Sequence, residues 1–600
     1  MKKKYFVVTL MLVAVFALSA FGFVGLYANT AYADPQTLDI YAINDFHGSV
    51  DKMPQIAGYL AARKSEGAVI VNSGDMFQGS MESNSNFGKL LAECMDMAGF
   101  DAFTYGNHEF DWGLDNLRSL AQNSSTPFLG ANIYNWNANT RQWGDFADDL
   151  AEPYNIVETN GLKVGIIGVI GKDQITSISS QLVQTIGFKD PSEVVPSISN
   201  KLRNEENCDI VIVSAHTGQS TFLEDNSWDI SQYADAVLCA HTHQREMDYK
   251  GDVTFIQAGS YGNYIAHVQL YVNSNNEVKC GKREYISYNS IGNNDIDSDV
   301  FSAVKTKIDN SNASIADEAN QVLGTLSGGY LNSQTAVPRL VSHAIAEYAA
   351  EQGYEIDLAM VNNARNSLQQ GNITYTSLYE AIPFDNVVYV AKVSGKDILN
   401  EAKYDSNSIW RVNGKAIENS DSKYYTIAVI DYLLYHQSSN RNYNYFPSAF
   451  RSGFTPVALT KSGVEVYNYR LITRDFLLSK QNIDASTYIA TNIYTDKNQL
   501  QSTVNMPSVG DDNQGGDTPG TDTPGNTPGN TPGNTPGNTP GTNEPGNTPG
   551  SNAPSTKPAQ PENKLPTYAI VLIAVGAVLI VVVVVVIVVL TLRKRNKNQQ

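Results

Sequence analysis

Short apolar runs recur between about Thr37 and Ser290, and they constrain the fold more than any other feature of this sequence. Several are almost continuous Val, Ile and Ala, as expected of strands that are buried on both faces. The runs are "LDIYAI", "GAVIVNS", "FDAFTY", "KVGIIGVIG", "CDIVIVSA", "ADAVLCA" and "VTFIQAG". The helix-like segments "NFGKLLAECMDMAG" and "PSEVVPSISNKLRNEE" alternate with them. This alternation predicts a layered α/β domain.

A second α/β-type region follows at about residues 323–505. The stretch between the two regions, residues 291–322, contains an apolar stripe of Val300, Val304 and Ile308. The spacing of this stripe predicts a helix that connects the two regions.

The two ends of the chain have the patterns of targeting segments. Residues 1–33 combine a basic start, an apolar run and a small-residue cleavage site, which predicts a secretory signal peptide. Residues 506–566 are dense in Pro, Gly, Thr and Asn and predict a flexible stalk. Residues 567–592 are an uncharged apolar run long enough to span a bilayer, and residues 593–600 form a basic tail that favours the cytoplasm. We therefore expect an exported protein whose outer domains are anchored by a C-terminal transmembrane helix.

Cell-wall association is an alternative to this anchor. The stretch "KLPTYA" resembles an LPxTG sorting signal, but its threonine is one place early and its glycine is missing. The sequence therefore favours a retained transmembrane helix.

The formal net charge is −19, and both ends of the chain are basic, so the body between them is more acidic still. We expect no binding of nucleic-acid polymers, because such surfaces are basic. A small anionic substrate must be attracted by local cations. The four cysteines form no CxxC metal pattern and do not suggest a disulfide scaffold.

Polar side chains follow the ends of the apolar runs, and five of the chain's eight histidines are among them. These residues are Asn44, Asp45, His47, Asp75, Asn107, His108, His216, His241 and His243. In open α/β sheets the ligand crevice lies outside the carboxyl ends of the strands. A single histidine at a strand end is more often a turn or cap residue, but five in this regular placement favour a shared site.

Imidazole and carboxylate ligands suit zinc, manganese or iron. Two Asp, one Asn and four His are too many for one tetrahedral ion, but they fit two divalent ions that share a bridging carboxylate. Such a pair, about 3.5–4 Å apart, generates hydroxide at neutral pH and clamps a phosphoryl group. The pattern therefore predicts a two-metal hydrolytic site.

Five motifs, in this order, resemble the signature of the calcineurin-like metallophosphatases in their 5′-nucleotidase and 2′,3′-cyclic phosphodiesterase branch: "NDFHG", "SGDMFQGS", "GNHEFDWG", "SAHTG" and "CAHTH". The resemblance covers roughly residues 38–505. It implies a four-layer β-sandwich flanked by helices over residues 36–290. A second α/β domain that binds substrate would follow over residues 323–505.

The resemblance also implies the ligand sets. One ion would be held by Asp45, His47, Asp75 and His243. The other would be held by Asp75, Asn107, His216 and His241, with Asp75 as the bridge. In this branch the position of His243 is often an amide, while histidine is common there in the wider superfamily.

His108 and Asp111 resemble the catalytic dyad of the family. The resemblance implies that His108 points at the substrate and that Asp111 orients it. A protonated His108 would stabilise the phosphoryl oxygens or protonate the leaving alkoxide. A metal-bound hydroxide would attack in line with the leaving group. Glu109 has no role in this scheme, and we expect a solvated or helix N-terminal carboxylate.

In the family the C-terminal domain supplies the nucleoside pocket. Arg339 falls on a helix that matches the family's substrate arginine region, and Arg365 sits where the family keeps its pocket arginine. A guanidinium at either position could bind phosphate or a base edge bidentately. For Arg365, a surface arginine in a loop is the alternative.

Two departures from the family pattern affect this pocket. The glycine-rich run before Arg365 reads "VNNA", so Asn362 or Asn363 would take over the family's asparagine role; we predict Asn363. Tyr432 stands for the stacking aromatic, but no Gly-Gly-Asp follows it. Trp410 is either a second stacking aromatic or a core residue.

The sequence thus predicts a surface-anchored phosphohydrolase that converts extracellular nucleotides to nucleoside and phosphate. 2′,3′-Cyclic nucleotides and UDP-sugars are alternative substrates of the same site. A non-catalytic surface binding protein or adhesin is an alternative of another class. A protein that had kept the fold and lost the reaction should lack metal ligands or a dyad residue, whereas this chain has all seven expected ligands and both dyad residues.

Overall fold

A computed structural model describes residues 36–501, apart from residues 226, 405, 414, 439, 463–464 and 490–499. The expected signal peptide, stalk, membrane span and basic tail lie outside these residues. All described residues belong to one unit of the chain. Within them, no helix has both the length and the apolarity that a membrane crossing requires.

The first half of the chain contains a six-stranded sheet. Its strands β1, β2, β3 and β4 run parallel to one another, β14 pairs antiparallel with β1, and β15 pairs antiparallel with β14. In spatial order the strands are β15 (Val278–Ser287), β14 (Tyr264–Val272), β1 (Gln36–Ile43), β2 (Val69–Asn72), β3 (Ala102–Thr104) and β4 (Phe128–Leu129).

A second six-stranded sheet has four parallel strands in its centre and an antiparallel strand at each edge. Its order is β12 (Arg245–Lys250), β13 (Val253–Ala258), β11 (Ala236–Cys239), β10 (Ile210–His216), β8 (Leu162–Ile170) and β7 (Tyr154–Thr159). The seven apolar runs of the sequence form β1, β2, β3, β8, β10, β11 and β13.

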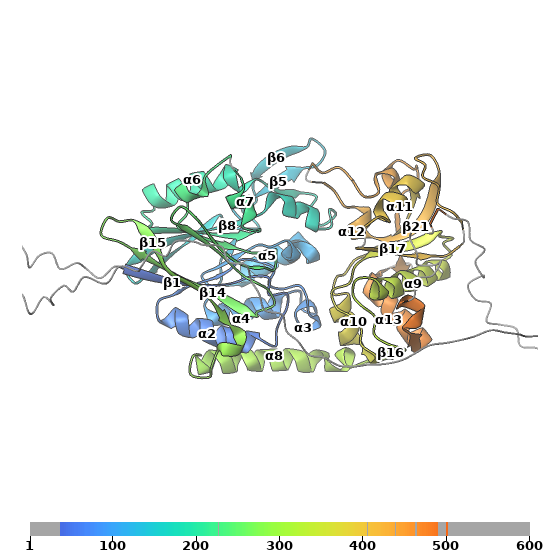
Figure 1. Ribbon diagram of the computed structural model, residues 1–600, viewed down its shortest axis with the longest axis horizontal. Helices are drawn as coiled ribbons and strands as arrows, with labels where there is room; N and C mark the ends of the chain where they lie inside the picture. The colour runs from blue at the N-terminus through green and yellow to red at the C-terminus, as the bar shows by residue number, and fades with distance from the viewer. Residues whose placement is uncertain are drawn as a thin grey trace, which may run out of the picture. The chain divides into compact units, whose positions relative to one another are not determined.

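Side-chain alternation builds three hydrophobic layers around these sheets. Val69 and Val71 of β2 belong to the core shared with Ile166 and Ile212 of the second sheet, whereas Ile70 belongs to the core under the helices. Figure 1 shows helices on both outer sides of the paired sheets. The layers are therefore helix, sheet, sheet, helix, which confirms the predicted four-layer sandwich.

The helices of this half pack mainly on the outer faces of the sheets. The first sheet is covered by α2 (Met53–Ser65) and α4 (Lys89–Ala98), and α6 (Pro191–Asn204) and α7 (Ser220–Leu223) cover the second. The remaining elements are α3 (Met81–Asn84), η1 (His108–Trp112), α5 (Leu114–Asn123), η2 (Lys172–Ser177), η3 (Ile230–Gln232), η4 (Tyr288–Ser290) and a small sheet of β6 (Gln142–Phe146), β5 (Ile133–Asn137) and β9 (Ile186–Phe188).

The expected connecting helix is present as α8 (Ser298–Ala319). Asp297 caps it by accepting hydrogen bonds from the backbone N–H groups of Asp299 and Val300. Val304 and Ile308 are buried against the helices of the first half. The helix also contacts α10 of the second half, so it bridges the two α/β regions.

The second half contains a five-stranded mixed sheet and a three-stranded sheet, in agreement with the expected second α/β domain. The larger sheet has the order β20 (Asn407–Arg411), β17 (Leu358–Asn362), β21 (Tyr424–Ile430), β19 (Val388–Ser394) and β22 (Val457–Ala458). The smaller has the order β18 (Gly371–Thr374), β16 (Val322–Ser327) and β25 (Asn482–Asp484), and β23 (Thr460–Lys461) pairs with β24 (Glu465–Val466).

The helices of the second half share one core with these sheets. The longest is α9 (Ala336–Glu351), whose buried face packs on β17 and β20. The others are α10 (Tyr375–Ala381), α11 (Gly395–Glu401), α12 (Asp431–Leu434), η5 (Pro447–Phe450), α13 (Tyr469–Lys480) and α14 (Ser486–Ile489).

The close approach of the two large sheets predicts a steric limit at Gly168 in β8. A Cβ atom there would lie 2.3 Å from the Cβ of Leu129 in the other sheet. Gly168→Ala should therefore destabilise the protein by about 1–3 kcal/mol through overpacking, measured as a lower urea midpoint. Gly281→Ala in β15 is the control, because the nearest atom to its Cβ is 3.3 Å away. An equal effect of both substitutions would contradict this account.

Candidate metal centre and active site

The predicted metal ligands lie in loops that follow the carboxyl ends of strands, and the backbone of most of them is left-handed. Positive φ angles occur at Asp45 (48°), His47 (47°), Asp75 (54°), His241 (74°) and His243 (61°). Such angles are uncommon for residues with a side chain and cost about 1–3 kcal/mol each. Their clustering at one place indicates that the loops are shaped for a site.

Two glycines allow these loops to approach one another. A Cβ atom at Gly74 would lie 2.6 Å from Nδ1 of His216, and one at Gly106 would lie 2.2 Å from Oδ1 of Asp75. Gly74 also has a φ of +98°. The loops after β2 and β3 can therefore close around Asp75 and His216 only because glycine occupies both positions.

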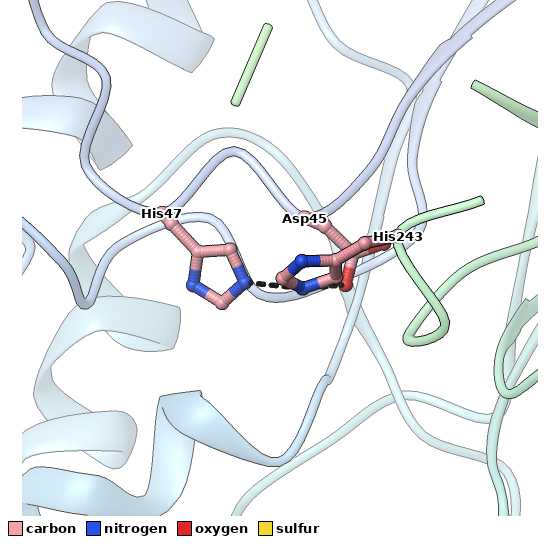
Figure 2. A group of neighbouring side chains, drawn as sticks. All are labelled: Asp45, His47 and His243. Atoms are coloured by element: carbon pink, nitrogen blue, oxygen red, sulfur yellow. Dashed lines mark hydrogen bonds and ion pairs between the residues drawn. The ribbon is translucent and has the colours of Figure 1, made fainter. Parts of the chain in front are cut away.

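One group of side chains that could hold a metal ion consists of Asp45, His47 and His243. Nε2 of His47 is 3.0 Å from Nε2 of His243, which in turn is 3.4 Å from Oδ1 of Asp45. Figure 2 shows the ring of His243 between the other two side chains. Asp45 and His47 are buried, while His243 is partly exposed.

A second group consists of Asp75, His216 and His241, with the amide of Asn107 among them. Oδ1 of Asn107 is 3.2 Å from Nε2 of His216 and 3.0 Å from Nδ1 of His241. Oδ2 of Asp75 is 3.3 Å from Nε2 of His216 and 3.8 Å from Nε2 of His47. Asp75 thus touches both groups, which is the position expected of a bridging carboxylate.

Hydrogen bonds outside these groups orient two of the imidazoles. Nδ1 of His47 lies 3.2 Å from the carbonyl oxygen of Gln78, and Nδ1 of His216 lies 2.9 Å from that of Ser73. A carbonyl only accepts, so Nδ1 carries a proton in each ring and Nε2 is the atom that faces the cluster. In the uncharged form of each ring, Nε2 turns a lone pair toward the cluster, and lone pairs that face one another fit a cation.

Burial keeps His47, His241 and His243 uncharged, as metal ligation requires. It lowers the pKa of His47 well below its usual value, and it lowers the pKa values of His241 and His243 to about 4. For His216 burial acts in the same direction, but the charge of Asp75 more than offsets it and raises the pKa to about 9. The donor set of nitrogen and oxygen atoms fits two divalent ions of the zinc or manganese type.

Glu109 lies in the first turn of η1, as one alternative from the sequence had it, but it is not solvated. It is fully buried and accepts hydrogen bonds from the backbone N–H groups of Asp75 (2.9 Å), Met76 (2.9 Å) and Gly106 (2.7 Å). Glu109 thereby joins the backbone of the loop after β2 to that of the loop after β3. The side chain of Glu109 points away from that of His108, because neighbouring residues of a 3₁₀-helix such as η1 point about 120° apart.

The same helix explains the dyad. Residues three apart in a 3₁₀-helix lie on one face, so His108 and Asp111 meet, with Nδ1 2.8 Å from Oδ2. Burial alone would lower the pKa of His108, but the charges of Asp111 and Asp75 outweigh it and raise the pKa. Nε2 of His108 faces the second half of the chain, where Nη2 of Arg365 is 3.3 Å away.

A cavity of about 300 Å³ adjoins the second metal group and is lined by both halves of the chain. The first half contributes Gln78, Asn107, His108, Asp111, Trp112, Ser177, Ser179, Leu182 and His241. The second half contributes Asn362, Asn363, Arg365, Phe384, Asp385, Asn386, Asp431 and Tyr432.

The predicted substrate residues fall into two sets. Asn363, Arg365 and Tyr432 line the cavity. Arg339 does not, because its position on α9 directs its guanidinium to the carbonyl oxygen of Tyr488, 2.9 Å away. Trp410 is only 7% exposed and stacks on His343 at a centroid distance of 4.0 Å, so it belongs to the core.

Phe384 and Asp431 are among the cavity residues that the sequence analysis did not predict as site residues. The ring of Phe384 stacks on His108 at 5.4 Å, and the guanidinium of Arg365 lies 5.0 Å from the centre of the same ring. Asp431 is a buried carboxylate at the start of α12. Asp431 has no sequence signal that distinguishes it from an ordinary cap residue.

Comparison with known families identifies both halves of the chain. Residues 38–245 match the model of the calcineurin-like phosphoesterases, and residues 319–401 match the C-terminal domain of the 5′-nucleotidases. The chain is therefore a metal-dependent phosphoesterase of the 5′-nucleotidase type.

Individual relatives are distant. Endonuclease YhcR of Bacillus subtilis is 26% identical over 410 residues, which cover 62% of this chain and 33% of that protein. A 5′-nucleotidase of Vibrio cholerae is 23% identical over 428 residues, covering 60% of this chain and 74% of its own. The crystal structure of a 5′-nucleotidase precursor from Thermus thermophilus superposes with a TM-score of 0.60 at 16% identity, over 74% of this chain and 97% of that one. This last likeness concerns the fold.

The contacts of Glu109 predict that it positions the metal groups. Glu109→Gln replaces one acceptor oxygen by an NH₂ group that must face backbone N–H donors. We expect zinc and manganese affinity to fall about 10–100-fold, measured by competition with a chromogenic chelator. Glu158→Gln removes an exposed carboxylate of β7 and is the control for charge. Unchanged metal affinity in Glu109→Gln would refute the positioning role.

Proposed function

Because the chain belongs, by both of its domains, to the 5′-nucleotidase family of metal-dependent phosphoesterases, we propose that it hydrolyses nucleotides to a nucleoside and phosphate. The observation that carries this proposal is Asp75, shared by two His/Asp groups beside a cavity that contains Arg365 and aromatic rings. The two His/Asp groups provide the hydrolytic chemistry, and the cavity provides room for a leaving group.

The two ions would be held by the seven predicted ligands. Two divalent ions in such a site polarise the phosphoryl group and activate a water molecule. Asp45, His47 and His243 would hold one ion, and Asn107, His216 and His241 would hold the other, with Asp75 between them.

His108 and Arg365 are placed to bind the phosphoryl oxygens. A guanidinium can only donate, so its contact with Nε2 of His108 requires an unprotonated nitrogen. Asp111 and Asp75 raise the pKa of His108 and favour its protonated form, which repels Arg365. A phosphoryl oxygen between the two would accept a hydrogen bond from each and remove the repulsion.

The remaining cavity residues would hold the leaving group. Trp112, Phe384 and Tyr432 offer ring faces for a nucleobase, and Asn362 and Asn363 offer amides for its polar edge. We therefore favour hydrolysis of nucleoside phosphates over a purely non-catalytic binding role, because the dyad and the ligand groups are complete, and 2′,3′-cyclic nucleotides remain the alternative substrate that the activity test addresses.

We further propose that the enzyme acts outside the cell. The support comes from the signal-like residues 1–33 and the apolar residues 567–592. Exposure of the phosphoesterase domain to protease on intact cells would test this location, and protection from protease would exclude it.

Phosphate release by the full chain, purified in detergent, tests the proposed activity. AMP should be hydrolysed in the presence of zinc or manganese and should not be hydrolysed after chelation. Asp75→Asn should remove the activity, because it takes one negative charge from both metal groups. Turnover of 2′,3′-cyclic AMP or an aryl phosphate without AMP would exclude the 5′-nucleotidase activity.

The dyad predicts a defect in turnover rather than in metal binding. His108→Asn and Asp111→Asn should each lower kcat for AMP, His108→Asn by about 10²–10⁴-fold, while metal content is unchanged. His267→Asn is the matched control, because His267 binds Asp39 and Glu284 on the outer part of the first sheet. Loss of metal in the dyad variants would show that His108 and Asp111 support metal binding and would contradict a role in turnover alone.

A further inference from the structure

Three aspartates line the cavity, and Arg365 is the one arginine or lysine among its described lining residues. The aspartates differ in whether a positively charged side chain pairs with them. Asp111 is bonded to His108 at 2.8 Å, and Asp385 forms an ion pair with Arg470. Asp431 forms no ion pair with any residue that the structure describes. Arg365, the cavity's arginine, likewise has no carboxylate partner among these residues. The cavity thus presents one uncompensated cation and one uncompensated anion.

The carboxylate of Asp431 is held by uncharged donors. The amide of Asn386 donates to Oδ1 at 2.8 Å, and the backbone N–H of Tyr432 donates to the same oxygen at 2.7 Å. Oδ2 therefore retains capacity for a further donor. The residue is 8% exposed and lines the cavity, so the surrounding protein screens its charge poorly.

The two uncompensated charges lie in different surroundings. Arg365 contacts His108 beside the metal groups, where the phosphoryl group would bind. Asp431 lies beside Tyr432 and Asn386, among the residues that would surround the leaving group. A substrate that satisfies both charges has one phosphate at the metal end and hydrogen-bond donors on its leaving group.

We propose that Asp431 is a specificity-determining residue that selects phosphate monoesters whose leaving group is uncharged or cationic and donates a hydrogen bond. The same carboxylate disfavours nucleoside di- and triphosphates and UDP-sugars, because their leaving groups bring a second negative charge into the cavity. This inference rests on the proposed phosphoesterase function and narrows its substrate class.

The steady-state test compares AMP with ADP and UDP-glucose in the full chain at pH 8, for the unmodified protein and for Asp431→Asn. The unmodified protein should prefer AMP, and the ratio of kcat/KM for AMP to that for ADP should fall about tenfold in Asp431→Asn. Asp421→Asn, which removes an exposed carboxylate paired with Lys396, is the control for net charge. An unchanged ratio in Asp431→Asn overturns the proposal.

A second measurement tests the uncompensated charge without any turnover. Burial raises the pKa of Asp431 to about 6; the hydrogen bond from Asn386 lowers it and the charge of Asp111 raises it. An acid whose pKa is raised by folding destabilises the protein increasingly as the pH rises from its usual pKa to the raised one, and the destabilisation is complete above about pH 6. Asp431→Asn should therefore raise Tm at pH 8, and the gain should shrink by pH 4.5. A lower Tm at pH 8 would show that the charge is compensated and would overturn the proposal.

The two experiments separate this inference from the proposed function. If AMP, ADP, UDP-glucose and an aryl phosphate all fail to release phosphate, the phosphoesterase function fails and the selection of substrates fails with it. If AMP and ADP are hydrolysed equally well by the unmodified protein, the phosphoesterase function holds and the role of Asp431 is excluded.

Discussion

The structure of the active site depends on the position of one carboxylate, that of Asp75. Oδ1 accepts the backbone N–H of His108 at 2.9 Å, and Oδ2 lies near His216 and His47. Burial would raise the pKa of this group, but the charges of His216 and His108 hold it well below its usual range. A permanent negative charge is therefore kept between the two metal groups. Moving Asp75 would disturb both groups and the dyad together.

Backbone conformation and backbone hydrogen bonds hold the carboxylate of Asp75 in place, in addition to the packing of its side chain. Asp75 has a left-handed φ, and Glu109 binds the N–H groups on either side of it as well as that of Gly106. Strained residues persist where the surrounding structure determines them fully. Here the buried strands β2 and β3 fix the loop ends, and Glu109 joins the two loops. The hydrophobic layers of the sandwich thus supply the rigidity that the polar site requires.

The sequence predicted the layered fold and the grouping of the histidines because both follow from local patterns. Apolar runs mark buried strands, and parallel strands bring their carboxyl ends to one edge. Of the sequence's two alternatives for Glu109, the helix N-terminal position is confirmed and the solvated carboxylate is wrong, because the direction of a side chain in a short 3₁₀-helix is not visible in composition. The surroundings of Arg339, Trp410 and Asp431 depend on contacts between segments far apart in the chain, such as that of Arg339 with Tyr488, and no local period reports these.

The proposed catalytic groups and Asp431, the proposed specificity residue, come from different parts of the chain, and contacts of His108 with Arg365 and Phe384 join the two parts. The metal groups and the dyad belong to the first α/β region, whereas Arg365 comes from the second. His108 and Arg365 are both cationic when His108 is protonated, so an anion between them is what makes their approach favourable. Phosphate is such an anion and also the product of the proposed reaction. The binding of phosphate would therefore stabilise the same arrangement of charges that the proposed reaction uses, so phosphate would compete with the substrate for this position.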